Sequence, residues 1–258
     1  MKILKYTKLK SNQYKLLLDN DLEIKLYDDV IVKYDLIRNK ELDDKKLEEI
    51  TNYNNELEAY YKAIKFITTR LRTEKEIYKK LSNDYDNKII NKTIKKLKEE
   101  KYLNNDIYLK CYVDDQVLLN NIGPNKIKDN LLKLGLYEED INNYLEGISR
   151  EVWIEKLEKI INKKIKSNHS YSINKLKEKL LYDLSREGFY KNMIEEVIDK
   201  STFNNDNNLL EKEYDKLYNK LSKKYESKEL EYQIKNKLLQ KGFYYDDISN
   251  LIQEKKNY

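Results

Sequence analysis

Residues 123–145, GPNKIKDNLLKLGLYEEDINNYL, contain the pattern that decides the fold. Pro124 is tolerated in the first turn of a helix, because the N–H group that proline lacks has no helical partner there. Ile127 and Leu131 lie on one side of that helix, and Gly135 is typical of the residue that follows a helix end. The stretch therefore predicts two short helices joined at a glycine.

The same pattern recurs towards the C-terminus. Residues 234–252, IKNKLLQKGFYYDDISNLI, repeat it at an offset of 107, so that Gly242 corresponds to Gly135. A further copy contains Gly188, and the three glycines fall 53 and 54 residues apart. A period near fifty predicts a helical repeat whose units contact mainly their neighbours. We therefore expect a mainly α fold of tandem helical repeats with an extended surface.

The composition agrees with a helical chain. Among 258 residues, 38% are charged, with one proline and five glycines, so residues that break helices are rare. The net charge of +5 comes from 51 basic and 46 acidic residues, which permits contact with nucleic acid without requiring it.

The location of the protein is predicted from its cysteine content and its apolar runs. Cys111 is the single cysteine, so an intramolecular disulfide is excluded and a reducing cytoplasm is favoured. No run approaches the roughly 18 apolar residues that a membrane span needs. We expect a soluble cytoplasmic protein that makes no contact with membranes.

The N-terminal region differs from the rest of the chain because apolar residues alternate there with a period of two. The alternating residues lie on either side of a polar turn at 19–21: Tyr14, Leu16, Leu18, Leu22, Ile24 and Leu26. This pattern predicts a β-hairpin. Because so few strands are not stable alone, we expect the hairpin to pack on the helices or to pair with another element.

The repeats divide the chain into five segments. The predicted bounds are 1–42 for a β-rich element, 43–105 for a long helix and repeat 1, 106–149 for repeat 2, 150–203 for repeat 3 and 204–258 for repeat 4. In repeat 1, Thr73 precedes Glu76 by three residues, which predicts a capping box. Repeat 1 also lacks the glycine and has Asp84 and Tyr85 in its place.

Residue patterns for catalysis are absent. His169 is the single histidine and lies in a polar stretch without a nearby cysteine, so neither a zinc site nor a Cys-His nucleophile is predicted. The sequence contains no glycine-rich phosphate loop and no GxSxG motif. We expect no cofactor, no metal site and no enzymatic activity.

Three segments, in this order and spacing, carry a resemblance to a known family. They are AIKFITTRLRTEKEIYKKL (63–81), KEEKYLNNDIYLKCYVDD (98–115) and GPNKIKDNLLKLGL (123–136). Over residues 60–258 the chain resembles the RecX family of regulatory proteins, which bind the RecA recombinase filament. The N-terminal hairpin resembles the extra segment of longer members.

The resemblance implies a non-enzymatic modulator whose tandem three-helix repeats form an elongated, curved body, which lies, as a monomer, in the groove of the RecA–DNA filament. By bridging neighbouring protomers it would restrain filament extension and inhibit ATP hydrolysis, strand exchange and coprotease activity. Two alternatives stay open: a DNA-binding protein that uses its helical repeats without RecA, and a helical scaffold for another partner.

Two groups of candidate residues follow. Glycine and proline positions are expected to be helix caps and hinges: Gly123, Pro124, Gly135, Gly188 and Gly242. Candidate partner-binding residues are basic: Arg70, Arg72, Lys126, Lys156, Lys159, Lys163 and Lys166. The arginines stand out because the guanidinium group suits carboxylate or phosphate partners. The last four lysines share one side of a predicted helix, and the alternative for them is a solvated helix face.

Overall fold

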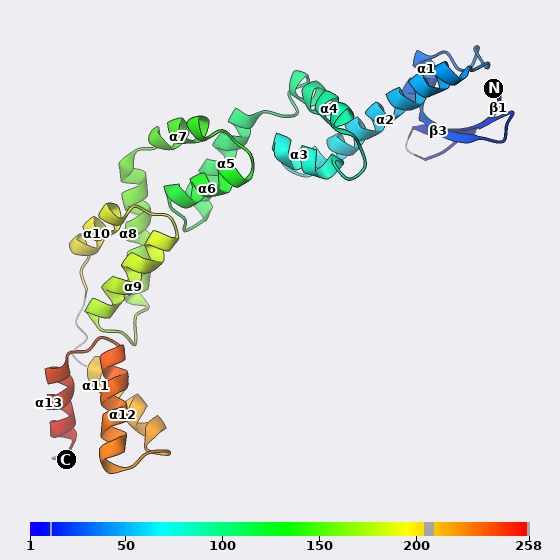
Figure 1. The fold of residues 1–258 in the computed structure, drawn as a ribbon. Helices are drawn as coiled ribbons and strands as arrows, with labels where there is room; N and C mark the ends of the chain where they lie inside the picture. Colours follow the sequence, from blue (N-terminus) through cyan, green and yellow to red (C-terminus); the bar gives the residue numbers. More distant parts are fainter. Residues whose placement is uncertain (11, 204–208, 257–258) are drawn as a thin grey trace. The chain divides into compact units, whose positions relative to one another are not determined.

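The structure, a computed structural model, describes residues 1–10, 12–203 and 209–256. It is mainly α-helical, with a three-stranded antiparallel sheet near the N-terminus (Figure 1). The predicted mainly α fold class is confirmed. The chain divides into two compact units, one formed by Met1–Lys110 with Lys133–Tyr137 and the other by Cys111–Leu132 with Glu138–Tyr258.

The predicted hairpin is present as β2 (Gln13–Leu18) and β3 (Glu23–Tyr27), with Leu16 opposite Ile24. A third strand, β1 (Ile3–Lys8), pairs with β2 and gives the strand order β1-β2-β3. The N-terminal element is therefore a small sheet rather than a hairpin. Sequence analysis missed β1 because only one of its side chains is buried, so the strand shows no alternation of apolar and polar residues.

The sheet packs on the first half of a 24-residue helix, α2 (Asp44–Ile67), with α1 (Asp28–Lys33) beside it. The backbone N–H of Tyr27 donates to the side-chain oxygen of Asn54 at 3.0 Å, so a buried polar group connects β3 to α2. The core of this part consists of Ile3, Leu16, Leu18, Leu26, Val30, Ile31, Leu36, Leu42, Ile50 and Leu57. The few strands are thus supported by helices.

Repeat 1 consists of the second half of α2, α3 (Glu74–Leu81) and α4 (Asn87–Glu99). The capping box is confirmed, because Thr73 Oγ1 accepts a hydrogen bond from the Glu76 N–H and the Glu76 carboxylate accepts one from the Thr73 N–H. The core of repeat 1 is formed by Ala59, Ala63, Ile77, Leu81, Ile90, Leu97 and Leu103.

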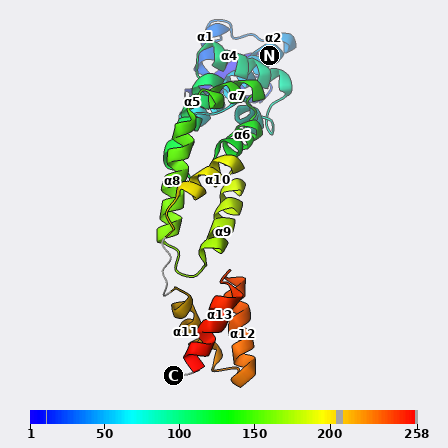
Figure 2. The same ribbon diagram turned by 90° about the vertical axis from the view of Figure 1, so that its left-hand side faces the viewer.

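The remaining helices form three further groups of three. Repeat 2 has α5 (Asn105–Leu119), α6 (Pro124–Lys133) and α7 (Glu138–Glu146). Repeat 3 has α8 (Arg150–Lys166), α9 (Ile173–Arg186) and α10 (Lys191–Lys200). Repeat 4 has α11 (Leu209–Leu221), α12 (Ser227–Gln240) and α13 (Tyr245–Lys256). In repeat 3, α10 lies against both α8 and α9 (Figure 2). Residues 204–208, which the predicted bounds place at the start of repeat 4, lie outside the described residues.

The repeated glycines end the second helix of repeats 2, 3 and 4. Gly135, Gly188 and Gly242 have φ values of +88°, +87° and +84°, which is the left-handed region that glycine enters without a steric cost. Pro124 occupies the first position of α6, as expected. The three glycines therefore act as helix caps.

The same glycine turns also make contacts between repeats. At each contact, which we call a junction, the start of the second helix of one repeat meets the glycine turn of the next repeat. In the first junction, Thr73 Oγ1 donates to the Leu134 carbonyl oxygen at 2.8 Å. A Cβ atom at Gly135 would lie 2.9 Å from Cβ of Lys75. The turn thus has no room for a side chain.

The second junction is made by the backbone. The N–H of Gly123 donates to the Glu187 carbonyl oxygen at 2.7 Å, and the N–H of Asn125 donates to the Gly188 carbonyl oxygen at 3.1 Å. A Cβ atom at Gly188 would overlap the backbone nitrogen of Lys126, and one at Gly123 would overlap the backbone of Gly188. Gly123 therefore permits the close approach of two chain segments, which is a more specific role than the predicted hinge.

The third junction uses one serine. Ser172 caps α9, since its hydroxyl oxygen accepts a hydrogen bond from the Lys175 N–H. The same hydroxyl donates to the Gly242 carbonyl oxygen at 2.6 Å, and the Ser172 N–H donates to the Lys241 carbonyl oxygen at 3.1 Å. One residue thus caps its own helix and holds the next repeat.

The junctions explain why repeat 1 has no glycine at the corresponding turn. This turn, at Asp84 and Tyr85, follows α3, and the preceding part of the chain is the sheet rather than a repeat. Neither residue has a positive φ. The Tyr85 side chain is half-buried, and the Lys62 ammonium group lies 5.6 Å from the centre of its ring. Because the sheet supplies no second helix of a preceding repeat, this turn makes no junction of the kind that requires a glycine.

The second junction gives the first testable prediction. We expect Gly188→Ala to lower the free energy of unfolding by at least about 1–2 kcal/mol, because alanine is strained at a left-handed position and its Cβ also overlaps Lys126. Gly147→Ala is the matched control, since its Cβ would lie no closer than 3.3 Å to its neighbours and it has no positive φ. We expect the control to stay within about 0.5 kcal/mol. Denaturation in urea measures both, and equal losses would contradict the junction.

Candidate functional site

The two candidate arginines lie in the turn between α2 and α3. The Arg72 side chain is only 12% exposed, its guanidinium carbon lies 3.7 Å from the centre of the Phe66 ring, and Nη1 is 3.2 Å from the Glu76 carboxylate. The Arg70 side chain is 56% exposed and Nη2 lies 2.6 Å from the same carboxylate. Arg72 therefore stabilises the turn, whereas Arg70 keeps an exposed guanidinium group beside its ion pair.

Lys126 belongs to the second junction. Its Nζ atom lies 2.6 Å from the Glu187 carboxylate, and both side chains are about two-fifths exposed. An ion pair with this exposure is screened by water and contributes little to stability. Its position nevertheless ties the Lys126 charge to the contact between repeats 2 and 3.

Lys156 differs from the other lysines of α8. Its Nζ atom donates hydrogen bonds to the carbonyl oxygens of Gln116 and Val117, each at 2.8 Å. These carbonyls belong to the last turn of α5, and the Gln116 carbonyl oxygen also accepts a hydrogen bond from the Asn120 N–H at 3.3 Å. Burial lowers the pKa of the Lys156 ammonium group to about 8. Lys156 thus caps a helix of the preceding repeat.

The other three lysines of the predicted row are exposed. Lys159, Lys163 and Lys166 line a shallow hollow on α8 together with Asn162, Ser167 and His169. Among the described residues, none of the three lysines has an ion-pair partner. This lysine row, 159, 163 and 166, is a concentration of positive charge that water alone screens.

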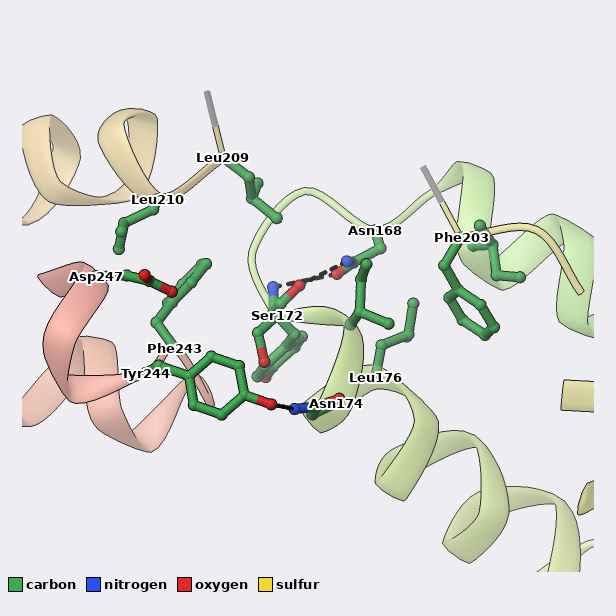
Figure 3. Close-up of a pocket in the computed structure, with 13 residues that line it drawn as sticks. Asn168, Ser172, Asn174, Leu176, Phe203, Leu209, Leu210, Phe243, Tyr244 and Asp247 are labelled. Atoms are coloured by element: carbon green, nitrogen blue, oxygen red, sulfur yellow. Dashed lines mark hydrogen bonds between the residues drawn. The ribbon is translucent and has the colours of Figure 1, made fainter. Parts of the chain in front are cut away.

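Sequence analysis did not identify a pocket between repeats 3 and 4, with a volume of about 580 Å³ (Figure 3). Its apolar walls include Leu176, Phe203 and Phe243, and the Asn174 amide donates to the Tyr244 hydroxyl at one side. Among the described lining residues, Asp247 is the one that carries a charge.

The described residues offer neither a cluster of metal ligands nor a membrane-spanning helix. Within residues 1–10, 12–203 and 209–256, no group of three or more histidine, cysteine or acidic side chains could hold a metal ion. No helix in the same residues is both long and apolar enough to cross a membrane.

Comparison with known proteins gives a consistent result. Residues 59–97 match the family model described as RecX, first three-helix domain. The chain is 34% identical over 264 aligned residues to "Regulatory protein RecX" of Streptococcus agalactiae serotype III, covering 98% of this chain and 99% of the relative. It is 27% identical to the protein of the same name from Leuconostoc mesenteroides subsp. mesenteroides, covering 95% and 93%.

Solved structures share the fold. A structure titled "Crystal structure of regulatory protein RecX" superposes with a TM-score of 0.65 at 24% identity, covering 77% of this chain and all of that one. A second, "Crystal structure of RecX from Lactobacillus salivarius", has a TM-score of 0.54 at 25% identity and covers 57% and 97%.

The Lys156 cap predicts a specific dependence of stability on pH. Its pKa is about 8 in the folded protein and 10.5 ordinarily, so between these values the unfolded chain binds a proton that the folded protein does not. The free energy of unfolding should therefore rise with pH in this window. Tyr61 and Tyr85, whose pKa values are raised to about 12, oppose the rise once tyrosines ionise near pH 10.0.

We expect Lys156→Met to flatten the rise, measured by urea denaturation at a series of pH values from 8 towards 10.0. Lys159→Met is the matched control, because Lys159 is exposed on the same helix, and it should keep the slope of the parent. A slope that is unchanged in Lys156→Met would contradict the assignment.

Proposed function

The chain belongs to the RecX family of regulatory proteins, and we propose on this premise that it regulates RecA by binding the RecA–DNA filament. Binding restrains extension of the filament and inhibits the ATPase, strand-exchange and coprotease activities of RecA. The observation that carries the proposal is the 34% identity to a RecX protein along almost the whole of both chains. In this proposal the protein acts as a cytoplasmic monomer and has no enzymatic activity of its own.

The repeat architecture supports a partner that is itself periodic. Each junction joins one repeat to the next through a few backbone and side-chain hydrogen bonds, so every repeat presents its own outer surface. Successive surfaces suit a polymer whose protomers also recur. Exposed basic residues, namely Arg70, Lys159, Lys163 and Lys166, are the candidate contacts that the folded chain leaves accessible.

The lysine row favours one alternative, direct binding of DNA without RecA. Three exposed lysines at a spacing of three and four residues lie on one side of α8, as phosphate-binding lysines do. The net charge of +5 is compatible with either partner. The two functions differ in how they depend on salt, since contacts with phosphates release counterions and weaken steeply as salt rises.

The function is tested by co-sedimentation with single-stranded DNA, bare or coated with RecA. We expect the protein to pellet with the coated DNA at salt concentrations that release it from bare DNA, and to reduce RecA's DNA-dependent ATPase rate. Replacing Lys159, Lys163 and Lys166 by glutamate should abolish binding to bare DNA. The control reverses the charge of Lys220, Lys223 and Lys224 in repeat 4, which are exposed and have no ion-pair partner among the described residues. If the protein is released from bare DNA and from RecA-coated DNA at the same salt concentration, direct DNA binding without RecA is favoured.

The number of repeats provides a further prediction. The core of repeat 4 is formed by its own residues, Tyr214, Leu217, Leu221, Ile234, Leu238, Ile248 and Ile252. Residues 1–203 should therefore fold without it. If repeats contact successive RecA protomers, their linked contacts act at high effective concentration, so the truncated protein should inhibit the RecA ATPase only at a much higher concentration. A soluble truncation that inhibits as well as the parent would confine the active surface to repeats 1 to 3.

A further inference from the structure

Helix α5 has apolar residues on all sides. Val113 faces the core and is fully buried, whereas Leu118 and Leu119 are 79% and 77% exposed. No other large apolar side chain among the described residues is as exposed as these two. Two large apolar side chains at adjacent exposed positions leave apolar surface in water, so this part of α5 lacks a cover.

The uncovered residues share one side of the helix. Cys111, Asp114, Asp115, Leu118 and Leu119 are exposed and are spaced by three, four, seven and eight residues from the first. Residues at this spacing are neighbours on a helix surface. We call this set the α5 outer face, and all of it lies in the unit that contains Cys111–Leu132.

The leucine pair lies next to a turn that is held in place. Lys156 donates to the carbonyl oxygens of Gln116 and Val117, which immediately precede the pair. The Gln116 carbonyl oxygen also accepts from the Asn120 N–H at 3.3 Å, so both the backbone and Lys156 hold this helix end. Exposure of Leu118 and Leu119 is therefore a property of a fixed helix end rather than of a frayed one.

The charge of the α5 outer face is negative. Asp114 accepts a hydrogen bond from the Tyr144 hydroxyl at 3.1 Å, which supplies no charge. Within the described part of the chain, neither Asp114 nor Asp115 forms an ion pair. Two carboxylates beside two exposed leucines repel the phosphates of nucleic acid and attract a lysine or arginine. An apolar centre with a charged rim is the composition of a protein interface.

We propose that the α5 outer face docks a protein segment that places apolar side chains on Leu118 and Leu119 and a lysine or arginine against Asp114 and Asp115. The assignment rests on the proposed function, so that the segment belongs to the RecA protomers that coat the filament. The α5 outer face is negatively charged and contacts protein in this proposal, whereas the lysine row is positively charged and is the candidate contact for DNA.

The first experiment measures binding to RecA-coated DNA by co-sedimentation. We expect Leu118→Ala with Leu119→Ala to weaken binding about tenfold, as loss of two central apolar contacts does. Asp114→Asn with Asp115→Asn should also weaken binding. The matched control is Val32→Ala with Ile37→Ala, a second pair of exposed apolar residues, at 75% and 65% exposure. It should bind like the parent, and thermal melting of all variants should match the parent because the changed residues are exposed.

The second experiment uses Cys111, the single cysteine, as a reporter on the same face. An environment-sensitive dye attached to its thiol should become shielded from a soluble quencher when the labelled protein binds the coated DNA. The control carries the dye at Ser222→Cys in a Cys111→Ser background, at an exposed position of repeat 4. We expect no change in quenching there.

The outcomes separate the two proposals. If the parent pellets with RecA-coated DNA while the leucine variant binds equally and the dye stays accessible, the docking face is overturned and the proposed function stands. If the parent does not bind RecA-coated DNA at all, both fall. Loss of bare-DNA binding in the leucine variant would assign the face to nucleic acid instead. A dimer of the parent that dissociates in the same variant, seen by sedimentation velocity, would assign the face to a second copy of this chain.

Discussion

The contact between a helix start and the glycine turn of the next repeat is the interaction on which the arrangement of the repeats depends. It occurs three times, each time with a donor at the start of the second helix and a carbonyl oxygen at the turn as acceptor. The donor group differs, from the Thr73 hydroxyl to the backbone of Gly123 and the hydroxyl and N–H of Ser172. The acceptor is always a backbone carbonyl oxygen at a turn that contains a glycine. The close approach of two chain segments is thus common to all three junctions, whereas the donor group differs between them.

This constraint gives the glycines two separate reasons to be present. A left-handed φ after the helix end is the first, and the absence of room for Cβ is the second. Gly123 shows that the second reason suffices alone, because it has no positive φ and yet its Cβ would overlap the chain at Gly188. The turn at Asp84 and Tyr85 shows the converse. Neither residue has a positive φ and the turn makes no junction, so both positions can carry side chains.

The sequence predicted the elements well and their contacts poorly. The glycine period, the capping box at Thr73 and the alternation around Leu16 identified helix ends and two strands, because each depends on residues close in sequence. β1 was missed because one buried residue, Ile3, produces no pattern. The contact of Gly123 with Gly188 joins positions far apart in the chain, and local spacing carries no information on such pairs.

The lysines of α8 show the same limit at the candidate site. Sequence spacing places Lys156 in one row with Lys159, Lys163 and Lys166, but the fold turns Lys156 to the carbonyls of α5 and leaves the others in water. Lysines that share one side of a helix can therefore have different roles, because one contacts the neighbouring helix and the others contact water. The α5 outer face was overlooked for a related reason, since an apolar residue in a helix is expected to be buried until the neighbouring helices are known.

The two ends of the array differ in a way that bears on how such proteins lengthen by duplication. In repeat 4, the start of α12 makes no junction with any other described part of the chain. The Glu226 side chain makes no cap hydrogen bond, and Ser227 has a φ of 47°. A duplicated repeat added there needs a suitable donor at one helix start. A repeat added before repeat 1 needs a glycine in place of Asp84 or Tyr85 and must also displace the sheet from α2. A copy added after repeat 4 therefore requires fewer changes than one added before repeat 1, where the sheet already packs on α2.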